Sequence, residues 1–221
     1  MYRGVLFDLD GVIVDTARYH FEAWKRLAIS LGTDFTTEQN EQLKGIGRLD
    51  SLRMILKWGD ITKSEEEQAQ LCLLKNGWYL NLISHMNKSE ILPGVQEMLE
   101  NLKENNVHIA LGSASKNAVS ILREVGLLDY FEEIIDGTKT TRSKPDPQTF
   151  ELGAKALELD PSKCVVIEDS IKGIEAARLG GFDTIGIGNP DPLAANLITV
   201  SDLTKLRYEC TDGTDNTRSL K

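Results

Sequence analysis

Two pairs of acidic residues in this sequence are placed to do chemistry together. Asp8 and Asp10 come directly after the apolar run Val5–Phe7, and Glu168 and Asp169 follow another apolar run far along the chain. Crowded carboxylates need a cation to neutralise them, and Mg²⁺ takes oxygen ligands and bridges to phosphate. A carboxylate can also act as a nucleophile and form an aspartyl phosphate. The acids therefore predict magnesium-dependent phosphoryl transfer.

The spacing of Asp8 and Asp10 favours two different roles. Side-chain direction repeats every two residues in an extended chain, so both carboxylates point the same way. With Asp8 as nucleophile, Asp10 is placed to act as general acid and base. Taken alone, such a pair also fits turn or helix-capping acids, so the interpretation depends on the segments that accompany it.

A hydroxyl and a lysine complete the set. Ser113 follows one apolar run, and Lys144 lies with Pro145 in the loop after another. The equatorial oxygens of a transferring phosphoryl group would be held by Ser113, nearby backbone N–H groups and Lys144. Alone, the lysine segment is an ordinary loop, and Glu168–Asp169 also fits acids at a helix start that Ser170 caps.

The elements that must position these groups are strands and helices in alternation. Five apolar runs without polar alternation predict strands buried on both faces of a parallel sheet: Gly4–Phe7, Val107–Leu111, Glu133–Ile135, Cys164–Ile167 and Thr184–Ile187. Helical patterns follow three of them, at Lys116–Val125, Pro147–Leu157 and Ile171–Leu179. This order predicts a doubly wound, Rossmann-like α/β core. Ligands bind at the carboxyl ends of its strands, where the polar groups gather.

The long gap between the first two strands has only helical patterns. One helix contains Phe21 to Leu31 and ends at Gly32, a second contains Leu52 to Leu56 and ends at Gly59, and a third begins at a capping box of Thr62 and Glu65. We expect a helical-bundle cap domain, residues 16–87, inserted into a catalytic core of residues 1–15 and 88–221. The chain passes between the core and the insert twice, so we expect the insert to act as a hinged lid. The polar tail, 211–221, is expected to be mobile.

The composition of the chain limits the kinds of partner that it is expected to bind. The formal net charge is −9 over 221 residues, which disfavours nucleic acid and anionic membranes. The three cysteines are widely spaced and suggest neither disulfides nor zinc. The N-terminus has no apolar stretch of signal-peptide length, so we expect a cytoplasmic protein. We expect a monomer that binds small-molecule sugar phosphates.

The ordered motifs resemble the haloacid dehalogenase superfamily over nearly the whole chain. Within it the sequence is most similar to the β-phosphoglucomutase family. That resemblance rests on segments Asp8–Ala28, Lys44–Ser51, Leu74–Tyr79, Gly112–Asn117, Ser143–Pro147 and Glu168–Ala176. The resemblance implies a phosphomutase, of the isomerase class, that interconverts β-D-glucose 1-phosphate and glucose 6-phosphate through β-glucose 1,6-bisphosphate.

The resemblance also implies a role for each matching residue. Asp8 is the nucleophile and Asp10 the acid and base. One Mg²⁺ per chain is held by the carboxylates of Asp8, Glu168 and Asp169 and by the backbone carbonyl of Asp10. The transferring phosphoryl group binds Ser113, the Ala114 amide and Lys144. The distal phosphate binds Arg48, Ser115, Lys116 and Asn117. The hinge and cap positions Thr16, His20 and Lys75 couple closure to activation of Asp10.

Two alternatives stay open. The same core motifs serve a sugar-phosphate phosphatase, in which water attacks the aspartyl phosphate. A non-catalytic phospho-sugar sensor is less favoured, because both Asp8 and Asp10 are retained. A dehalogenase is disfavoured, because displacing halide from carbon needs neither Mg²⁺ nor Asp10. Trp24, Trp58 and Trp78 are interpreted as core of the helical insert and not as a sugar-stacking platform.

Overall fold

The computed structural model describes residues 2–188, 198–210 and 218–220. A parallel sheet with strand order β3-β2-β1-β4-β5-β6 organises the chain. Its strands are β1 (Gly4–Phe7), β2 (His108–Gly112), β3 (Glu133–Ile135), β4 (Cys164–Glu168), β5 (Asp183–Ile187) and β6 (Ile198–Val200). Phe7 lies opposite Leu111 on one side and Ile167 on the other. The residues that follow these three positions therefore emerge together at the carboxyl edge of the sheet.

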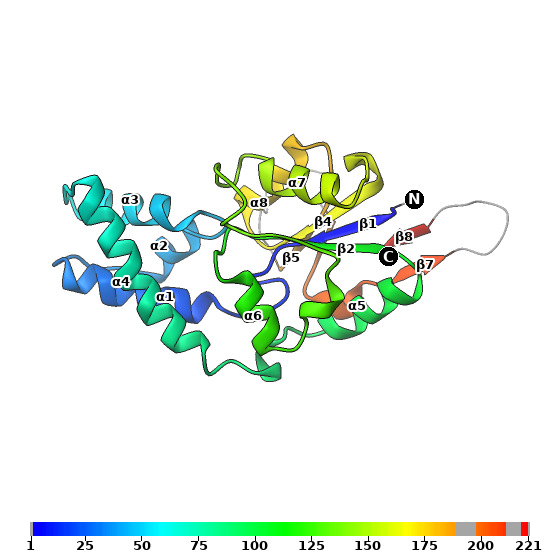
Figure 1. Ribbon diagram of the computed structural model, residues 1–221, viewed down its shortest axis with the longest axis horizontal. Helices are drawn as coiled ribbons and strands as arrows, with labels where there is room; N and C mark the ends of the chain where they lie inside the picture. Colours follow the sequence, from blue (N-terminus) through cyan, green and yellow to red (C-terminus); the bar gives the residue numbers. More distant parts are fainter. Residues whose placement is uncertain (1, 189–197, 211–217, 221) are drawn as a thin grey trace.

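Helices cover both faces of this sheet, as the sequence predicts for a doubly wound fold. In Figure 1, α5 (Val95–Glu104) and α6 (Ala118–Glu124) lie below the strands, while α7 (Gln148–Ala156) and α8 (Ile171–Leu179) lie above them. The apolar residues of β1, β2 and β4 are fully buried between these layers. Strands without polar alternation are stable only where both faces are covered, so the sheet sits at the centre of the core.

The helical insert, residues 16–87, lies at one end of the molecule, at the left of Figure 1. It contains α1 (Ala17–Ser30), α2 (Thr37–Gln42), α3 (Arg48–Trp58) and α4 (Glu65–Ile83), and no strand in this wholly described segment. Trp24, Leu27, Phe35, Leu52 and Ile55 form its own apolar cluster. An insert with its own core can move as a body on the sheet domain.

The two chain crossings between the insert and the sheet lie against each other. Val14 and Ile91 form an isolated antiparallel bridge, and the Leu92 N–H donates to the Ile13 carbonyl over 3.0 Å. The Asp15 N–H donates to the Glu90 carbonyl over 3.2 Å. Paired backbone crossings of this kind restrict the insert to rotation about one short hinge.

Two details of the insert differ from the sequence prediction. The capping box of α4 uses Ser64 and Glu67, whose side chains bond each other's backbone N–H groups, and not Thr62 and Glu65. Both pairs satisfy the same four-residue pattern, so spacing alone did not distinguish them. The short helix α2, which the sequence analysis did not predict, begins at a second such box formed by Thr36 and Gln39.

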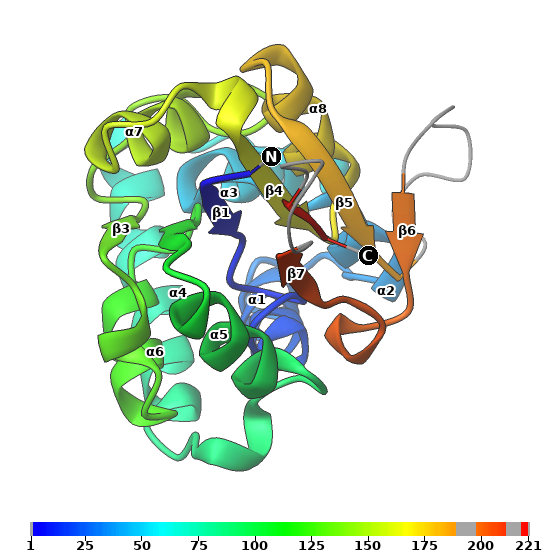
Figure 2. The same ribbon diagram turned by 90° about the vertical axis from the view of Figure 1, so that its right-hand side faces the viewer.

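The C-terminal part adds strands that the sequence analysis also missed. β7 (Tyr208–Cys210) pairs antiparallel with β8 (Arg218–Leu220), beside the sheet in Figure 2. Residues 218–220 were expected to belong to a mobile tail, which is wrong for these three. The rest of that expectation, at 211–217 and 221, lies outside the described residues. Short 3₁₀ turns occur at Lys88–Glu90, Leu128–Tyr130, Pro161–Lys163 and Leu203–Lys205. Within the described ranges no helix is long and apolar enough to cross a bilayer.

Candidate active site

The acids predicted from the sequence meet at the carboxyl edge of the sheet. Asp8 follows β1, Glu168 ends β4 and Asp169 comes next in the chain. One carboxylate oxygen from each lies within 4.8 Å of the others, a spacing that suits a shared cation. The Asp10 carboxylate is not part of this cluster among the described residues. Any contribution of Asp10 to a metal therefore comes from its main chain.

Lys144 is buried against this cluster and neutralises part of it. Its ammonium donates to Asp8 Oδ1 over 2.6 Å, to Glu168 Oε1 over 2.7 Å and to the Gly112 carbonyl over 3.2 Å. Burial acts to lower the pKa of Lys144, but Asp8 and Glu168 outweigh it and raise the pKa above its ordinary value. The lysine is therefore a permanent cation. The peptide bond between Lys144 and Pro145 is cis.

Burial shapes the protonation of the acids. It raises the pKa of Asp8 to about 6, against the opposing charge of Lys144. Burial, together with the charge of Glu168, raises the pKa of Asp169 to about 7. For Asp10, burial and the charges of Asp8 and Asp169 raise the pKa to about 8. Carboxyls crowded in this way favour either protonation or a bound cation.

Two glycines make room for the cluster. A Cβ on Gly173, in the first turn of α8, would overlap the Glu168 carboxylate, and a Cβ on Gly11 would overlap that of Asp169. Gly11 has φ +86°, a conformation that side chains disfavour. Ser170 caps α8 through the Gly173 N–H, and its own N–H and hydroxyl donate to Glu168 over 2.6 and 2.9 Å. The capping role expected for Ser170 is thus combined with holding a cluster acid.

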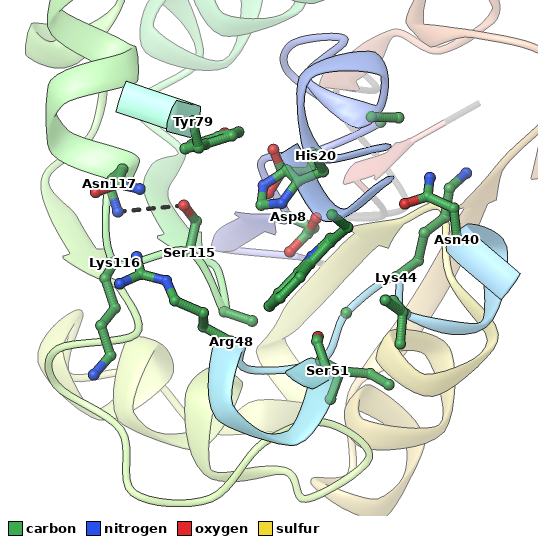
Figure 3. Close-up of a pocket in the computed structure, with 18 of the residues that line it drawn as sticks. Asp8, His20, Asn40, Lys44, Arg48, Ser51, Tyr79, Ser115, Lys116 and Asn117 are labelled. Carbon is green, nitrogen blue, oxygen red and sulfur yellow. Dashed lines mark hydrogen bonds between the residues drawn. The ribbon is translucent and has the colours of Figure 1, made fainter. Parts of the chain in front are cut away.

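A turn after β2 supplies hydroxyl and backbone donors. Ser113 is buried, and its Oγ accepts from the Ser115 N–H over 3.0 Å. The Ser115 Oγ in turn accepts from the Asn117 N–H over 3.2 Å, the dashed line in Figure 3. Gly137 packs against the Ala114 carbonyl so closely that a Cβ there would clash. The turn is thereby fixed beside Asp8, with Lys116 exposed at its tip.

A cavity of about 860 Å³, counted with its opening to solvent, lies between this edge and the helical insert. Asp8, Asp10 and Asp169 line one part of it, and a separate set of predicted residues lines another: Arg48, Ala114, Ser115, Lys116 and Asn117. In Figure 3 the Arg48 guanidinium lies beside Ser115 and Asn117. The cavity thus has an acidic end and a basic end.

Ser113, Lys144 and Glu168 do not line this cavity, which separates them from the rest of the predicted set. Each is buried, with an exposed fraction of 2% or less. They contact groups that line the cavity: Lys144 bonds Asp8 over 2.6 Å, and Ser113 accepts from the Ser115 N–H over 3.0 Å. Thr16 is also fully buried, and its hydroxyl donates a hydrogen bond to Asp10 Oδ1.

His20 and Lys75 meet inside the insert. The Lys75 ammonium lies 3.0 Å from His20 Nδ1 and 4.6 Å from the ring centres of both Trp24 and Tyr79. Burial lowers the pKa of Lys75 to about 7, and the Arg48 charge acts in the same direction. Burial, with Lys75 and Arg48, also lowers the pKa of His20 well below its ordinary value. The lowered pKa favours a neutral His20, whose Nδ1 pairs with the Lys75 side chain.

Several cavity residues were not identified from the sequence. Lys44, in the turn after α2, pairs with Asp169 over 3.2 Å and with Glu41 over 3.0 Å. Asn76 of α4 accepts from the Asn117 side chain over 3.1 Å. Lys44 begins one of the motifs that carry the resemblance, but no role was inferred from it. These contacts depend on how the insert docks onto the sheet, which no local pattern encodes.

The three tryptophans belong to the core of the insert, as predicted. Trp24 is buried in the apolar cluster of the insert, and Trp58 and Trp78 are partly buried against it. Trp24 also lines the cavity, which the core interpretation did not include. Its ring faces the Lys75 ammonium, so its contact inside the cavity includes a cation–π interaction.

Comparisons with known proteins agree with this geometry. β-Phosphoglucomutase of Bacillus subtilis is 42% identical over 91% of this chain and 92% of its own length. A phosphorylated carbohydrates phosphatase of Thermotoga maritima is 32% identical over 83% of each chain. The crystal structure of β-phosphoglucomutase from Clostridium difficile superposes with a TM-score of 0.90 at 41% identity, covering 94% of each chain. The model of the haloacid dehalogenase-like hydrolases matches residues 2–181. The chain therefore belongs to the haloacid dehalogenase-like hydrolase family.

Proposed function

We propose that this chain interconverts β-D-glucose 1-phosphate and glucose 6-phosphate through an aspartyl-phosphate enzyme and β-glucose 1,6-bisphosphate. One observation carries the proposal: a single cavity joins the Asp8 end to a separate basic end at Arg48 and Lys116. A mutase must hold two phosphates at once, and a hydrolase only one. The 42% identity to a relative named β-phosphoglucomutase supports the same reaction.

In this proposal Asp8 attacks the phosphoryl group in line. Its carboxylate is held by the Lys144 ammonium at 2.6 Å, which fixes the direction from which it approaches. Ser113 and the Ala114 N–H would receive the equatorial oxygens of the group in transfer, together with Lys144. Ser113 and Ala114 are fixed before the reaction by the turn after β2, so they need no reorganisation as charge develops.

The donor set suits one Mg²⁺ per chain. Asp8, Glu168 and Asp169 would hold it with their carboxylates, and Asp10 with its backbone carbonyl. Three clustered acids, two of them buried, against the cations Lys144 and Lys44 leave negative charge that favours a divalent ion. Their oxygen ligands suit a hard one. When bound, Mg²⁺ neutralises charge on the phosphoryl oxygens.

Asp10 would protonate the leaving oxygen and then accept the proton of the incoming hydroxyl. Its pKa, raised to about 8, leaves it protonated at neutral pH, which the first step requires. The Thr16 hydroxyl donates to Asp10 Oδ1 and fixes the orientation of the carboxyl. The loss of that proton in the first step prepares Asp10 as the base for the second.

The helical insert, residues 16–87, would serve as a cap domain on the catalytic core of residues 1–15 and 88–221. Arg48 from α3 and Ser115, Lys116 and Asn117 from the core would hold the distal phosphate. Ser143 donates to Asp50 over 2.8 Å, and Asn117 donates to Asn76 over 3.1 Å, so the insert is closed on the core. Closure excludes water from the aspartyl phosphate.

Thr16, His20 and Lys75 would couple this closure to the position of Asp10. They form a chain from α4 through α1 to the acid: Lys75 contacts His20 at 3.0 Å, and Thr16 donates to Asp10. All three lie on helices of the insert or at its first crossing. Rotation of the insert therefore carries this chain toward or away from Asp10. We expect the enzyme to act as a monomer.

A phosphatase is the second candidate, favoured by the 32% identity to the Thermotoga relative. One assay separates the two. The purified protein is incubated with Mg²⁺, β-glucose 1-phosphate and a trace of the 1,6-bisphosphate, and glucose 6-phosphate and free phosphate are followed together. Glucose 6-phosphate with little free phosphate supports the mutase. Free phosphate equal to the substrate consumed would make the chain a phosphatase.

A further inference from the structure

Asn40 is a buried polar residue that the roles above leave unused. It belongs to α2, is 7% exposed and lines the same cavity as Asp8. Within the part of the chain that the structure describes, its side-chain amide makes no hydrogen bond to protein. Figure 3 shows this amide directed into the cavity. Asn40 therefore presents free donors and a free acceptor to whatever occupies the cavity.

The fold of α2 does not require this side chain. The N-terminus of the helix is already satisfied by the capping box of Thr36 and Gln39. Leu43, the next inward-facing residue of this segment, packs in the apolar cluster of the insert. The Asn40 amide atoms are not among the buried atoms without a partner, because they face the cavity. They are therefore free to bond a group that enters it, and a ligand explains this amide better than packing does.

The position of Asn40 identifies which part of a ligand it meets. In Figure 3, Asn40 lies on the opposite side of the cavity from Arg48, and both line the cavity with Asp8. Both phosphates of a bisphosphate are accounted for, one at Asp8 and one at the basic end. Lys44, the basic residue nearest to Asn40 along the chain, is already paired with Asp169 and Glu41. Asn40 is left to face the neutral sugar ring.

We propose that Asn40 recognises an unphosphorylated ring hydroxyl of the sugar phosphate and is a specificity-determining residue. This inference rests on the proposed function. A mutase must bind the ring in two orientations, because either phosphate is transferred in turn. An amide offers both donors and an acceptor, so it can serve the hydroxyls that each orientation presents. A carboxylate or an ammonium offers only one kind of bond.

The test compares variants with substrate analogues that lack single hydroxyls. We would measure kcat/KM of the native protein, Asn40→Ala and the nearly isosteric Asn40→Leu. The substrates are β-glucose 1-phosphate and its 2-deoxy, 3-deoxy and 4-deoxy analogues. Gln42→Ala is the matched control, because it removes an exposed amide from the same helix. The Asn40 variants should lose about tenfold in kcat/KM on the parent sugar, the effect of one hydrogen bond to a buried group.

The pattern across the analogues decides the role of Asn40. For at least one deoxy analogue, the native protein and the Asn40 variants should have equal kcat/KM, because the bond is absent in both. An equal loss on the parent and all three analogues would show a structural role and overturn the inference. A native protein without mutase activity would instead refute the proposed function. Calorimetric binding of glucose 6-phosphate and its deoxy analogues to the same variants then decides the role of Asn40 alone.

Discussion

Lys144 places its ammonium 2.6 Å from the Asp8 carboxylate, with the lysine side chain wholly inaccessible to solvent. The same ammonium lies 2.7 Å from the equally buried Glu168. One cation therefore serves both the proposed nucleophile and a proposed metal ligand. This arrangement ties the stability of the core to its chemistry, because two buried carboxylates depend on a single partner for charge.

Replacing Lys144 by methionine should damage both properties. Removing one partner of a buried ion pair typically costs about 3–5 kcal/mol, because a charge is left uncompensated. Loss of a preorganised donor to the phosphoryl oxygens should lower kcat by at least about 100-fold. Urea unfolding and steady-state assays measure the two effects. Lys155→Met, on the exposed surface of α7, is the control and should change neither. A Lys144→Met protein of native stability would contradict the charge argument.

Variants of Asp10 and Asp169 should show separate effects on acid–base chemistry and on metal binding. Only the backbone of Asp10 is proposed to reach the metal, so Asp10→Asn should keep Mg²⁺ affinity within a few-fold. Its turnover should fall by roughly 10²–10⁴, the usual contribution of a general acid. Asp169→Asn removes a carboxylate of the cluster and should weaken Mg²⁺ binding strongly. Calorimetric Mg²⁺ titration of both variants is the measurement. Weak binding by Asp10→Asn would contradict the role given to its side chain.

Replacing Arg48 should change the proportion of aspartyl phosphate that is transferred to the sugar or hydrolysed to free phosphate. Charge-assisted hydrogen bonds contribute about 1.5–3 kcal/mol, so Arg48→Ala should lower the mutase rate by roughly 10- to 100-fold. Hydrolysis needs no distal phosphate, so the fraction of product that is free phosphate should rise. Arg53→Ala, which removes an exposed arginine from the same helix, is the matched control. Unchanged turnover of the glucose phosphate in Arg48→Ala would rule out a site for two phosphates.

Much of the core could be predicted because its signals are local. The residues of β1 and β3 were placed without error. The predicted β4 and β5 differ by one residue at one end, and the predicted β2 is shifted by one residue at both ends. Apolar runs of this kind have few alternatives to a doubly covered strand. The groups at the carboxyl edge followed from strand order alone, since each directly follows a strand or lies in the next loop. Their roles stay predictions.

The sequence analysis missed several elements for different physical reasons. β6, β7 and β8 have three residues each, and no helical pattern follows them in the sequence to mark them as part of a βαβ unit, as one does for the equally short β3. By contrast, α5 carries buried Val95, Met98, Leu99 and Leu102 at helical spacing, so its signal was present and was overlooked. Asn40 and Lys44 could not be found in this way. They matter only through the docking of the insert. Asn40 belongs to no recognised motif, and Lys44 begins a motif from which no role for it was inferred.

Lys75 should make the stability of the native protein depend on pH. Burial lowers its pKa to about 7, whereas the ordinary value is 10.5. Between these values the unfolded chain binds more protons than the folded one, so the free energy of unfolding should rise with pH across this window. Below it, both states carry the charge, and the folded state bears the full cost of burying the ammonium. The faces of Trp24 and Tyr79 offset only part of that cost.

Lys75→Met removes this titration and should therefore be more stable than the native protein at about pH 6. The difference between the two proteins should shrink steadily as the pH approaches 10.5, where Lys75 of the native protein is neutral in both states. Urea unfolding of both proteins over this range measures the titration of Lys75 together with its effect on the pKa values of His20 and Asp10. Lys57→Met, at the exposed end of α3, should run parallel to the native protein throughout. If Lys75→Met also ran parallel to it, the ammonium would be solvated at neutral pH, and the contact with His20 would not be held in a dry interior.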